Sequence, residues 1–246
     1  MLLGVEAWGG EFRPLSRLVD CPSAGGPLPG WTEMELRFFP DGGVLGSFSL
    51  GIFSRLWVGI SYGGDGIIGY SVPQWNPQPG VSAAFRLVNE SLLLPAVALG
   101  FSNQGYGSWV KDEKRYFYRA KGVYILAAKN FAFPLVGEWG WHLGVNRNQQ
   151  EGDGEEGYFA GLSFRPIPLV EVIGEFSSPW KKSSSPRSLS LNRGTLNAAL
   201  RWTVGSRMAV DLIVHDLLLD LKADARGGKS VGRELRILYR EPLLAR

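Results

Sequence analysis

The chain has 246 residues, of which 20% are charged, and its net charge is +3. Charge this small and scattered gives no basis for nucleic-acid binding, and the single cysteine, Cys21, excludes an internal disulfide framework. No apolar run reaches the ~18–20 residues of a transmembrane helix, whereas a membrane barrel needs only every second residue to be apolar.

Nearly every segment between turn residues alternates apolar and polar side chains, as β-strands do, and no stretch shows a sustained helical period. The strands predicted from this pattern, taken in chain order, are 33–38, 43–53, 56–63, 81–89, 92–101, 115–129, 135–147, 158–165, 169–177, 195–204, 208–215 and 234–240.

The segment 115–129 shows the alternation most plainly. Its even positions, from Tyr116 to Ala128, carry no charge, whereas its odd positions include Arg119 and Lys121. Successive side chains of a strand point to opposite faces, so we expect the even set to face outward and the odd set inward.

An apolar outer face could meet either lipid or, in a soluble protein, a core. A cation at the bilayer midplane costs about 2–4 kcal/mol, and the apolar sets of the predicted strands are essentially free of charge. Aromatic residues near strand ends are typical of an interfacial belt, which favours lipid. The predicted lipid-facing belt comprises Tyr62, Tyr116, Trp139, Trp141, Trp202 and Tyr239.

The connections alternate in length after the first hairpin. Short ones are expected at 54–55, 89–91, 130–134, 166–168 and 205–207, and long ones at 64–80, 102–114, 148–157, 178–194 and 216–233. Outer-membrane barrels have short periplasmic turns and long extracellular loops. The sequence therefore predicts an all-β fold: a closed, antiparallel, up-and-down transmembrane β-barrel of about twelve strands in the outer membrane.

The polar faces of the strands carry charges of both signs. The residues predicted to face the lumen are Glu33, Glu35, Arg37, Arg86, Arg119, Lys121, Glu138, His142, Glu171, Glu175, Arg201, Asp211, Glu234 and Arg236. Two interpretations stay open: a lumen plugged by ion pairs, or a polar conduit for a hydrophilic solute or saccharide. No ring of one sign marks a selectivity filter.

No catalytic residues are predicted. The only histidines are His142 and His215, the sequence places no serine beside either, and no metal-ligand spacing or cofactor motif is present. The main hypothesis is a non-enzymatic, porin-like barrel. The alternatives are a barrel hydrolase similar to outer-membrane phospholipases and a soluble, lipocalin-like barrel with an apolar ligand. The loop segment 104–109 (QGYGSW) could stack on a saccharide or pack within its loop.

The first thirty residues are predicted to form a separate segment, 1–30, with the barrel over 31–246. This segment could plug the lumen or stay in the periplasm as a partner-binding tail, and the position of Trp8 would distinguish the two. The acidic residue in Leu18-Val19-Asp20 disfavours lipidation of Cys21. The start of the chain has no signal-peptide pattern, so we expect a leader to have been removed.

Several ordered runs carry a resemblance to a known family. They are PSAGGPLPG (22–30), RFFPDGG (37–43), GIFSRLWVGISYGG (51–64), RLVNES (86–91), PAVALGFSNQGYG (95–107) and RYFYRAKGVYILAAKNF (115–131). Together they resemble the YjbH-like outer-membrane β-barrels and related uncharacterised barrels of Gram-negative-type bacteria. The resemblance implies a role in exopolysaccharide production or secretion, with polysaccharide or secretion components as partners beside the lipid bilayer. It implies no catalytic residues, and no feature predicts an oligomeric state.

Overall fold

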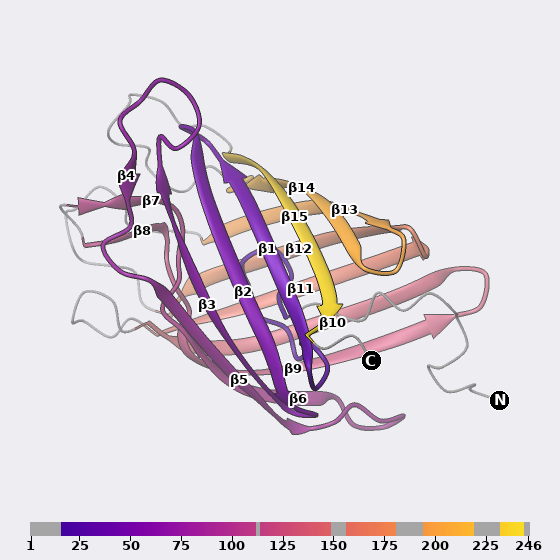
Figure 1. Ribbon diagram of the computed structural model, residues 1–246. Coiled ribbons are helices and arrows are strands. Elements are labelled where there is room, and N and C mark those ends of the chain that lie inside the picture. The colour runs from indigo at the N-terminus through magenta and orange to yellow at the C-terminus, as the bar shows by residue number, and fades with distance from the viewer. Residues whose placement is uncertain (1–15, 112–113, 149–155, 181–193, 219–231, 244–246) are drawn as a thin grey trace.

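A computed structural model describes residues 16–111, 114–148, 156–180, 194–218 and 232–243 of the chain (Figure 1). Twelve long antiparallel strands pair in chain order, and the first pairs with the last, which closes a barrel. The barrel strands are β1 (Trp31–Phe39), β2 (Gly43–Phe53), β3 (Leu56–Asp65), β5 (Gly80–Val88), β6 (Ala96–Ser102), β9 (Gly122–Phe133), β10 (Gly137–Arg147), β11 (Glu156–Ile167), β12 (Val170–Pro179), β13 (Thr195–Val204), β14 (Met208–His215) and β15 (Gly232–Pro242).

Three short strands lie outside this closed sequence of pairs. Strand β4 (Gln74–Trp75) pairs with the end of β3, and β7 (Tyr106–Val110) pairs with β8 (Arg115–Tyr118) in a separate two-stranded sheet. The β7–β8 sheet lies at the end of the barrel where the long connections gather (Figure 1). No helix able to cross a bilayer occurs among the described residues.

The predicted fold class is confirmed, including the alternation of connection lengths. Short connections span 54–55, 89–95, 134–136, 168–169 and 205–207, and long ones span 66–79, 103–121, 148–155, 180–194 and 216–231. The turn at 89–91 is longer than predicted because Ser91 and Leu94 form their own turn, closed by a hydrogen bond from Ser91 N to Leu94 O at 3.0 Å.

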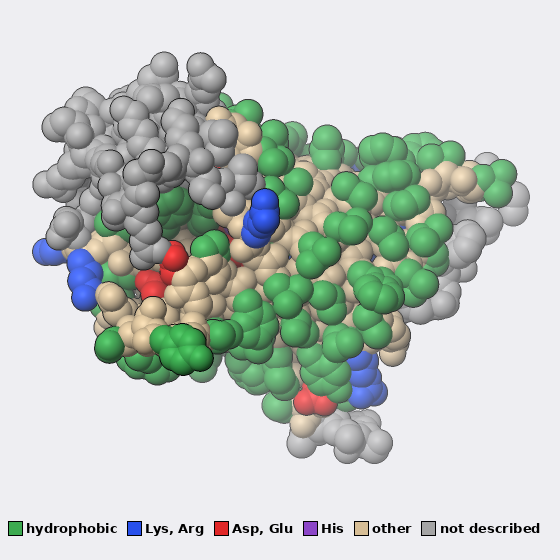
Figure 2. All heavy atoms as spheres, turned by 90° about the horizontal axis from the view of Figure 1, so that it is seen from above, with side chains coloured by type: hydrophobic (Ala, Val, Ile, Leu, Met, Phe, Trp, Pro, Cys, Tyr) green, Lys and Arg blue, Asp and Glu red, His purple; other side chains and the backbone are tan. Residues whose placement is uncertain are grey.

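The outer face of the wall is apolar (Figure 2). Outward side chains of the described strands are well exposed, for example Leu162 at 60% and Trp202 at 59%. The alternation along β13 is regular, because Arg201 is buried between the exposed Leu200 and Trp202. Period-two patterning therefore gives an apolar exterior and a charged interior, as the sequence predicts.

The prediction for 115–129 is wrong in two respects. The predicted strand is interrupted at 119–121, so residues 115–118 form β8 and only the residues from Gly122 onward belong to the barrel. In β9 the even residues face inward: Leu126 is 2% exposed, whereas Ile125 is 43% exposed. From Val123 to Ala128 both faces of this strand are apolar. Arg119 and Lys121, thought to mark its inner face, lie in the connection, and Lys129 binds the backbone of the turn at Ser91 and Leu92.

Residues 16–30, which we call the lumen segment, lie inside the barrel against its wall. Their first half is a tight hairpin, in which Arg17 bridges Pro22 and Leu18 N donates to Cys21 O at 2.9 Å. Cys21 and Ala24 pack with Trp57, Tyr124 and Phe159, and Leu18 and Val19 pack with Ile173, Ala199 and Ile213. The predicted marker Trp8 lies outside the described residues, as do most residues of the long connections predicted at 178–194 and 216–233.

Candidate functional site in the lumen

Glu175 on β12 binds the tip of the lumen segment through backbone amides. Its carboxylate accepts hydrogen bonds from Val19 N at 3.0 Å, Asp20 N at 3.0 Å and Cys21 N at 2.9 Å. Asn197 Nδ2 on the neighbouring strand donates to the same carboxylate at 2.9 Å. One buried acid is thus satisfied almost wholly by the backbone of a tight turn.

Three arginines bind the carbonyl groups of the same turn. Arg37 Nη2 donates to Val19 O at 2.7 Å and Arg236 Nη1 donates to it at 2.8 Å. Arg201 Nη2 donates to Leu18 O at 3.3 Å, and Arg236 Nη2 binds that carbonyl as well. These arginines come from β1, β13 and β15, so three strands converge on two consecutive peptide groups.

Acids on the wall balance these arginines. Asp211 accepts from Arg201 Nε at 2.9 Å and from Arg236 Nε at 2.8 Å, and Glu171 accepts from Arg201 Nη1 at 3.0 Å. The lumen segment adds its own acid, because Arg37 Nη1 donates to Asp20 Oδ1 at 2.9 Å. Buried charges are tolerable only when paired and hydrogen-bonded, and here both conditions are met.

A second group of contacts surrounds His215 at the end of β14. Its Nδ1 lies 3.4 Å from Asp20 Oδ2, and its Nε2 lies 3.1 Å from Glu234 Oε1. The ring of Tyr118 on β8 stacks on the imidazole, with centroids 4.5 Å apart and planes at 24°. His215 therefore contacts the lumen segment, the wall and the β7–β8 sheet.

Cys21, at the tip of the lumen segment, is fully buried and unoxidised. Burial, together with the nearby Glu175 carboxylate, raises the pKa of the Cys21 thiol well above its usual range. A thiol held in this way stays protonated and is a poor nucleophile, because the thiolate is the reactive form.

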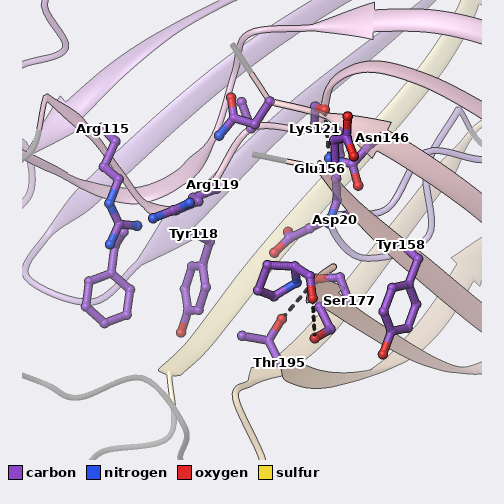
Figure 3. Close-up of a pocket in the computed structure, with 16 residues that line it drawn as sticks. Asp20, Arg115, Tyr118, Arg119, Lys121, Asn146, Glu156, Tyr158, Ser177 and Thr195 are labelled. Carbon is purple, nitrogen blue, oxygen red and sulfur yellow. Dashed lines mark hydrogen bonds between the residues drawn. The ribbon is translucent and has the colours of Figure 1, made fainter. Parts of the chain in front are cut away.

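A small cavity of ≈ 70 Å³ lies above the lumen segment at the end with the long connections (Figure 3). Figure 3 shows Arg115, Tyr118 and Arg119 toward one side of it, and Lys121 and Glu156 toward another. Asp20 also lines the cavity, as do Ser177 and Thr195, whose hydroxyl oxygens are 3.1 Å apart. The lining carries charges of both signs, as the sequence predicts for the lumen.

The structure brings most of the predicted lumen residues together. Those buried on the inner faces of barrel strands are Glu33, Glu35, Arg37, His142, Glu171, Glu175, Arg201, Asp211, Glu234 and Arg236. Arg86 is half-buried and donates from Nε to Ala24 O at 2.8 Å. Glu138 lies near the short-turn end, 3.2 Å from Arg165 Nη1. Arg119 and Lys121 lie in the connection before β9 and line the cavity.

The predicted site omits several residues that the structure includes. Arg240 pairs with Glu33, with Nε 2.9 Å from Oε2, and Asn197 and Arg165 join the acids named above. All three stand in the polar sets of their strands, so the alternation pattern could have identified them. Asp20 could not be identified in this way, because polar and apolar residues do not alternate regularly along the lumen segment.

The predicted aromatic belt is only partly outward. Tyr62, Trp139 and Trp202 are exposed on the outer face, and Trp141 and Tyr239 are half-buried. Tyr116 was wrongly included: it belongs to β8 and is 3% exposed, packed edge-on against Trp109 with ring centroids 5.0 Å apart.

The aromatic residues of segment 104–109 pack within the protein. Tyr106 is buried, and the Arg37 guanidinium lies 3.9 Å from the centroid of its ring. An open saccharide-stacking surface is therefore not what this segment forms. Within the described ranges, no group of three or more His, Cys, Asp or Glu side chains could hold a metal ion.

Comparisons with known proteins show the fold. No family model matches the chain, and no curated protein does, so the resemblance to YjbH-like barrels is not confirmed. Among solved structures, the KdgM porin matches with a TM-score of 0.53 and 10% identity, over 85% of this chain and 98% of that chain. The NanC porin matches with a TM-score of 0.48 at 8% identity, over 87% of this chain and 100% of that chain.

Omp33 of Acinetobacter baumannii is similar at a TM-score of 0.46 and 10% identity, over 86% of this chain and 97% of that chain. Identities this low show the fold alone, and the KdgM match carries that conclusion. The chain thus has the fold of the outer-membrane porins, a closed antiparallel barrel with an apolar exterior.

Proposed function

We propose that this chain is a non-enzymatic outer-membrane barrel with a channel-type role, in which residues 16–30 close the lumen as a plug. The observation that carries the proposal is the set of hydrogen bonds to residues 18–21. Backbone amides of this turn donate to Glu175, and its carbonyls accept from Arg37, Arg201 and Arg236. The wall is complementary to the backbone of this turn.

The location follows from the outer face. Exposed leucines, valines and aromatics on every barrel strand would aggregate in water, whereas a bilayer solvates them. The porin fold supports the same location. The two histidines, His142 and His215, are both buried on the inner wall, away from any lipid substrate.

The channel role follows from what the segment covers. Withdrawal of residues 16–30 would expose a lumen lined by Glu171, Glu175, Arg201, Asp211 and Arg236, which water can hydrate. Such a lumen has no excess of one sign and would pass polar solutes without strong charge selection. We propose a polar solute or an exported polysaccharide as its cargo.

Single-channel recording in a planar bilayer tests the closure. The intact chain should conduct little, and Glu175→Gln should raise the open fraction, because a neutral amide is a weaker acceptor for three backbone amides. Glu138→Gln is the matched control: it makes the same chemical change at a lumen residue that binds Arg165. A fully open intact chain, or equal conductance in both variants, would overturn the proposal.

A further inference from the structure

His215 joins the lumen segment to the wall through two carboxylates. Asp20 Oδ2 of the segment lies 3.4 Å from Nδ1, and Glu234 Oε1 of β15 lies 3.1 Å from Nε2. His215, Asp20 and Glu234 are all buried. Neither ring nitrogen meets hydrogen-bond geometry, so these are ion-pair contacts, and the imidazole links the carboxylate of the segment to the carboxylate of the barrel through its charge.

Other ionisable groups face the same imidazole. Arg37 on β1 lies 2.9 Å from Asp20 and 3.8 Å from Glu234, and Tyr118 on β8 stacks on the ring. Asp216 follows His215 in the chain, and its backbone N donates to Asn197 Oδ1 at 3.0 Å. Among His215, Asp20, Glu234 and Arg37, the charges balance only when the imidazole is protonated.

The protonation state decides how many contacts the imidazole can make. A doubly protonated ring presents an N–H to each carboxylate, whereas a neutral ring has one bare nitrogen, whose lone pair must face a carboxylate oxygen. Loss of the proton therefore removes the charge that attracts both acids, and the bare nitrogen is repelled by the carboxylate that faces it. Arg37 still holds Asp20, so the segment is loosened rather than expelled.

We propose that His215 is a pH-sensitive latch that holds the lumen segment in place when protonated and loosens it when neutral. The inference rests on the proposed closure of the lumen. The latch predicts the direction of the pH dependence: the closed state is favoured at mildly acidic pH, and opening increases as the pH rises.

The single cysteine reports the state of the segment directly. Cys21 adjoins Asp20 and is fully buried, so alkylation by a maleimide requires the segment to move. The rate is measured on the folded intact chain and on His215→Gln, which mimics a neutral ring. Because both proteins have the same thiol, comparison at each pH removes the titration of the thiol itself.

At about pH 6 the intact chain should react about tenfold more slowly than His215→Gln, the effect of one charge-assisted contact, and at about pH 9 the rates should converge. His142→Gln is the control, because this buried histidine lies on β10 and should leave the pH dependence unchanged. A ratio that is the same at both pH values would overturn the latch.

Asp20→Asn provides a second test should His215→Gln not fold. This substitution alters the segment and leaves the wall intact. The Cys21 of Asp20→Asn should be alkylated faster than that of the intact chain, and this difference in rate should shrink as the pH rises. A constant excess would count against the latch.

Conductance separates the two proposals. If labelling follows pH while the bilayer stays silent, the latch stands and the channel role fails. If Glu175→Gln opens the pore but neither labelling nor conductance follows pH, the channel role stands and the latch fails.

Discussion

The lumen segment lies between two walls of different character. On one side, β12–β15 and β1 present a charged wall, with Glu175, Arg201, Arg236 and Arg37 bound to backbone groups. On the other side, β3, β5, β6 and β9 present an apolar wall with Trp57, Ala84, Ala98, Leu126 and Ala128 against Cys21 and Ala24.

The two walls hold the segment in different ways. Hydrogen bonds to charged groups are directional, so the charged wall determines the position and orientation of the peptide groups of the segment. Apolar contact is not directional and depends on filled volume, so the apolar wall fixes how closely the segment approaches. Without the segment, water could hydrate the charged wall, whereas exposure of the apolar wall to water would cost hydrophobic free energy.

The largest effect is expected on the charged wall, from Arg236→Met. This change leaves Asp211 with one arginine instead of two and removes one of the two arginine donors from each of Leu18 O and Val19 O. Breaking such a buried pair costs about 3–5 kcal/mol. The loss in free energy of unfolding is measured by urea titration in detergent micelles, with the gel migration of unheated samples reporting the folded fraction. Arg233→Met is the control on the same strand, since Arg233 is exposed. Equal stability of the two variants would remove the distinction between the walls.

A smaller effect is expected on the apolar wall, from Leu126→Ala. Deleting a buried leucine costs about 2–5 kcal/mol, and we expect the lower end because Cys21 and Ala24 can shift into the space. Leu162→Ala removes the same atoms from the outer face, where detergent fills the gap, and should cost less in the same urea titration. A larger loss at Leu162 would reverse the assignment of faces.

Gly161→Ala tests the fit of the segment without changing any charge. The added Cβ would lie 2.1 Å from Leu18 Cδ1, so Leu18 must move, and we expect a loss of about 1 kcal/mol with faster Cys21 labelling. Gly174→Ala on the next strand is the matched control, because its Cβ would meet nothing within 4 Å. If Cys21 is alkylated at the same rate in both variants, the packing of Leu18 against Gly161 does not hold the segment in place.

The smallest effect concerns the reactivity of the Cys21 thiol in the folded chain. The raised pKa of Cys21 means that its thiol stays protonated at about pH 8.5, where a free thiol is half ionised. Alkylation of the folded chain should therefore lag far behind that of the unfolded chain at this pH. Glu175→Gln should narrow the gap, because it removes a negative charge that raises the pKa. An unchanged gap would show that Glu175 has no part in it.

The charged wall could be predicted from the sequence and the apolar wall could not. On β13, Asn197, Arg201 and Thr203 alternate with apolar residues, so the inner face is marked. On β9 the residues Val123, Tyr124, Ile125 and Leu126 are all apolar, and alternation cannot choose a face. Inner side chains need not be polar where a segment covers them.

The position of the lumen segment could not be predicted for a different reason. The tip of the segment, residues 18–21, binds Glu175 and the arginines of the wall largely through backbone amides and carbonyls, which every sequence possesses. Their binding partners, such as Glu175, were predicted as lumen residues, but nothing in the sequence of Val19, Asp20 and Cys21 indicates that a buried acid binds their amides.

The shared carbonyl of Val19 has a consequence for how the barrel assembles. Arg37 on the first strand and Arg236 on the last are direct partners across the β1–β15 seam, and like charges so placed repel. Val19 O accepts from both, and Asp20 supplies a carboxylate to Arg37, so the segment adds to the wall acids Glu35 and Asp211 that offset this repulsion where the two ends of the barrel meet. The contacts of the lumen segment therefore join the first and last strands of the barrel to each other as well as to the segment.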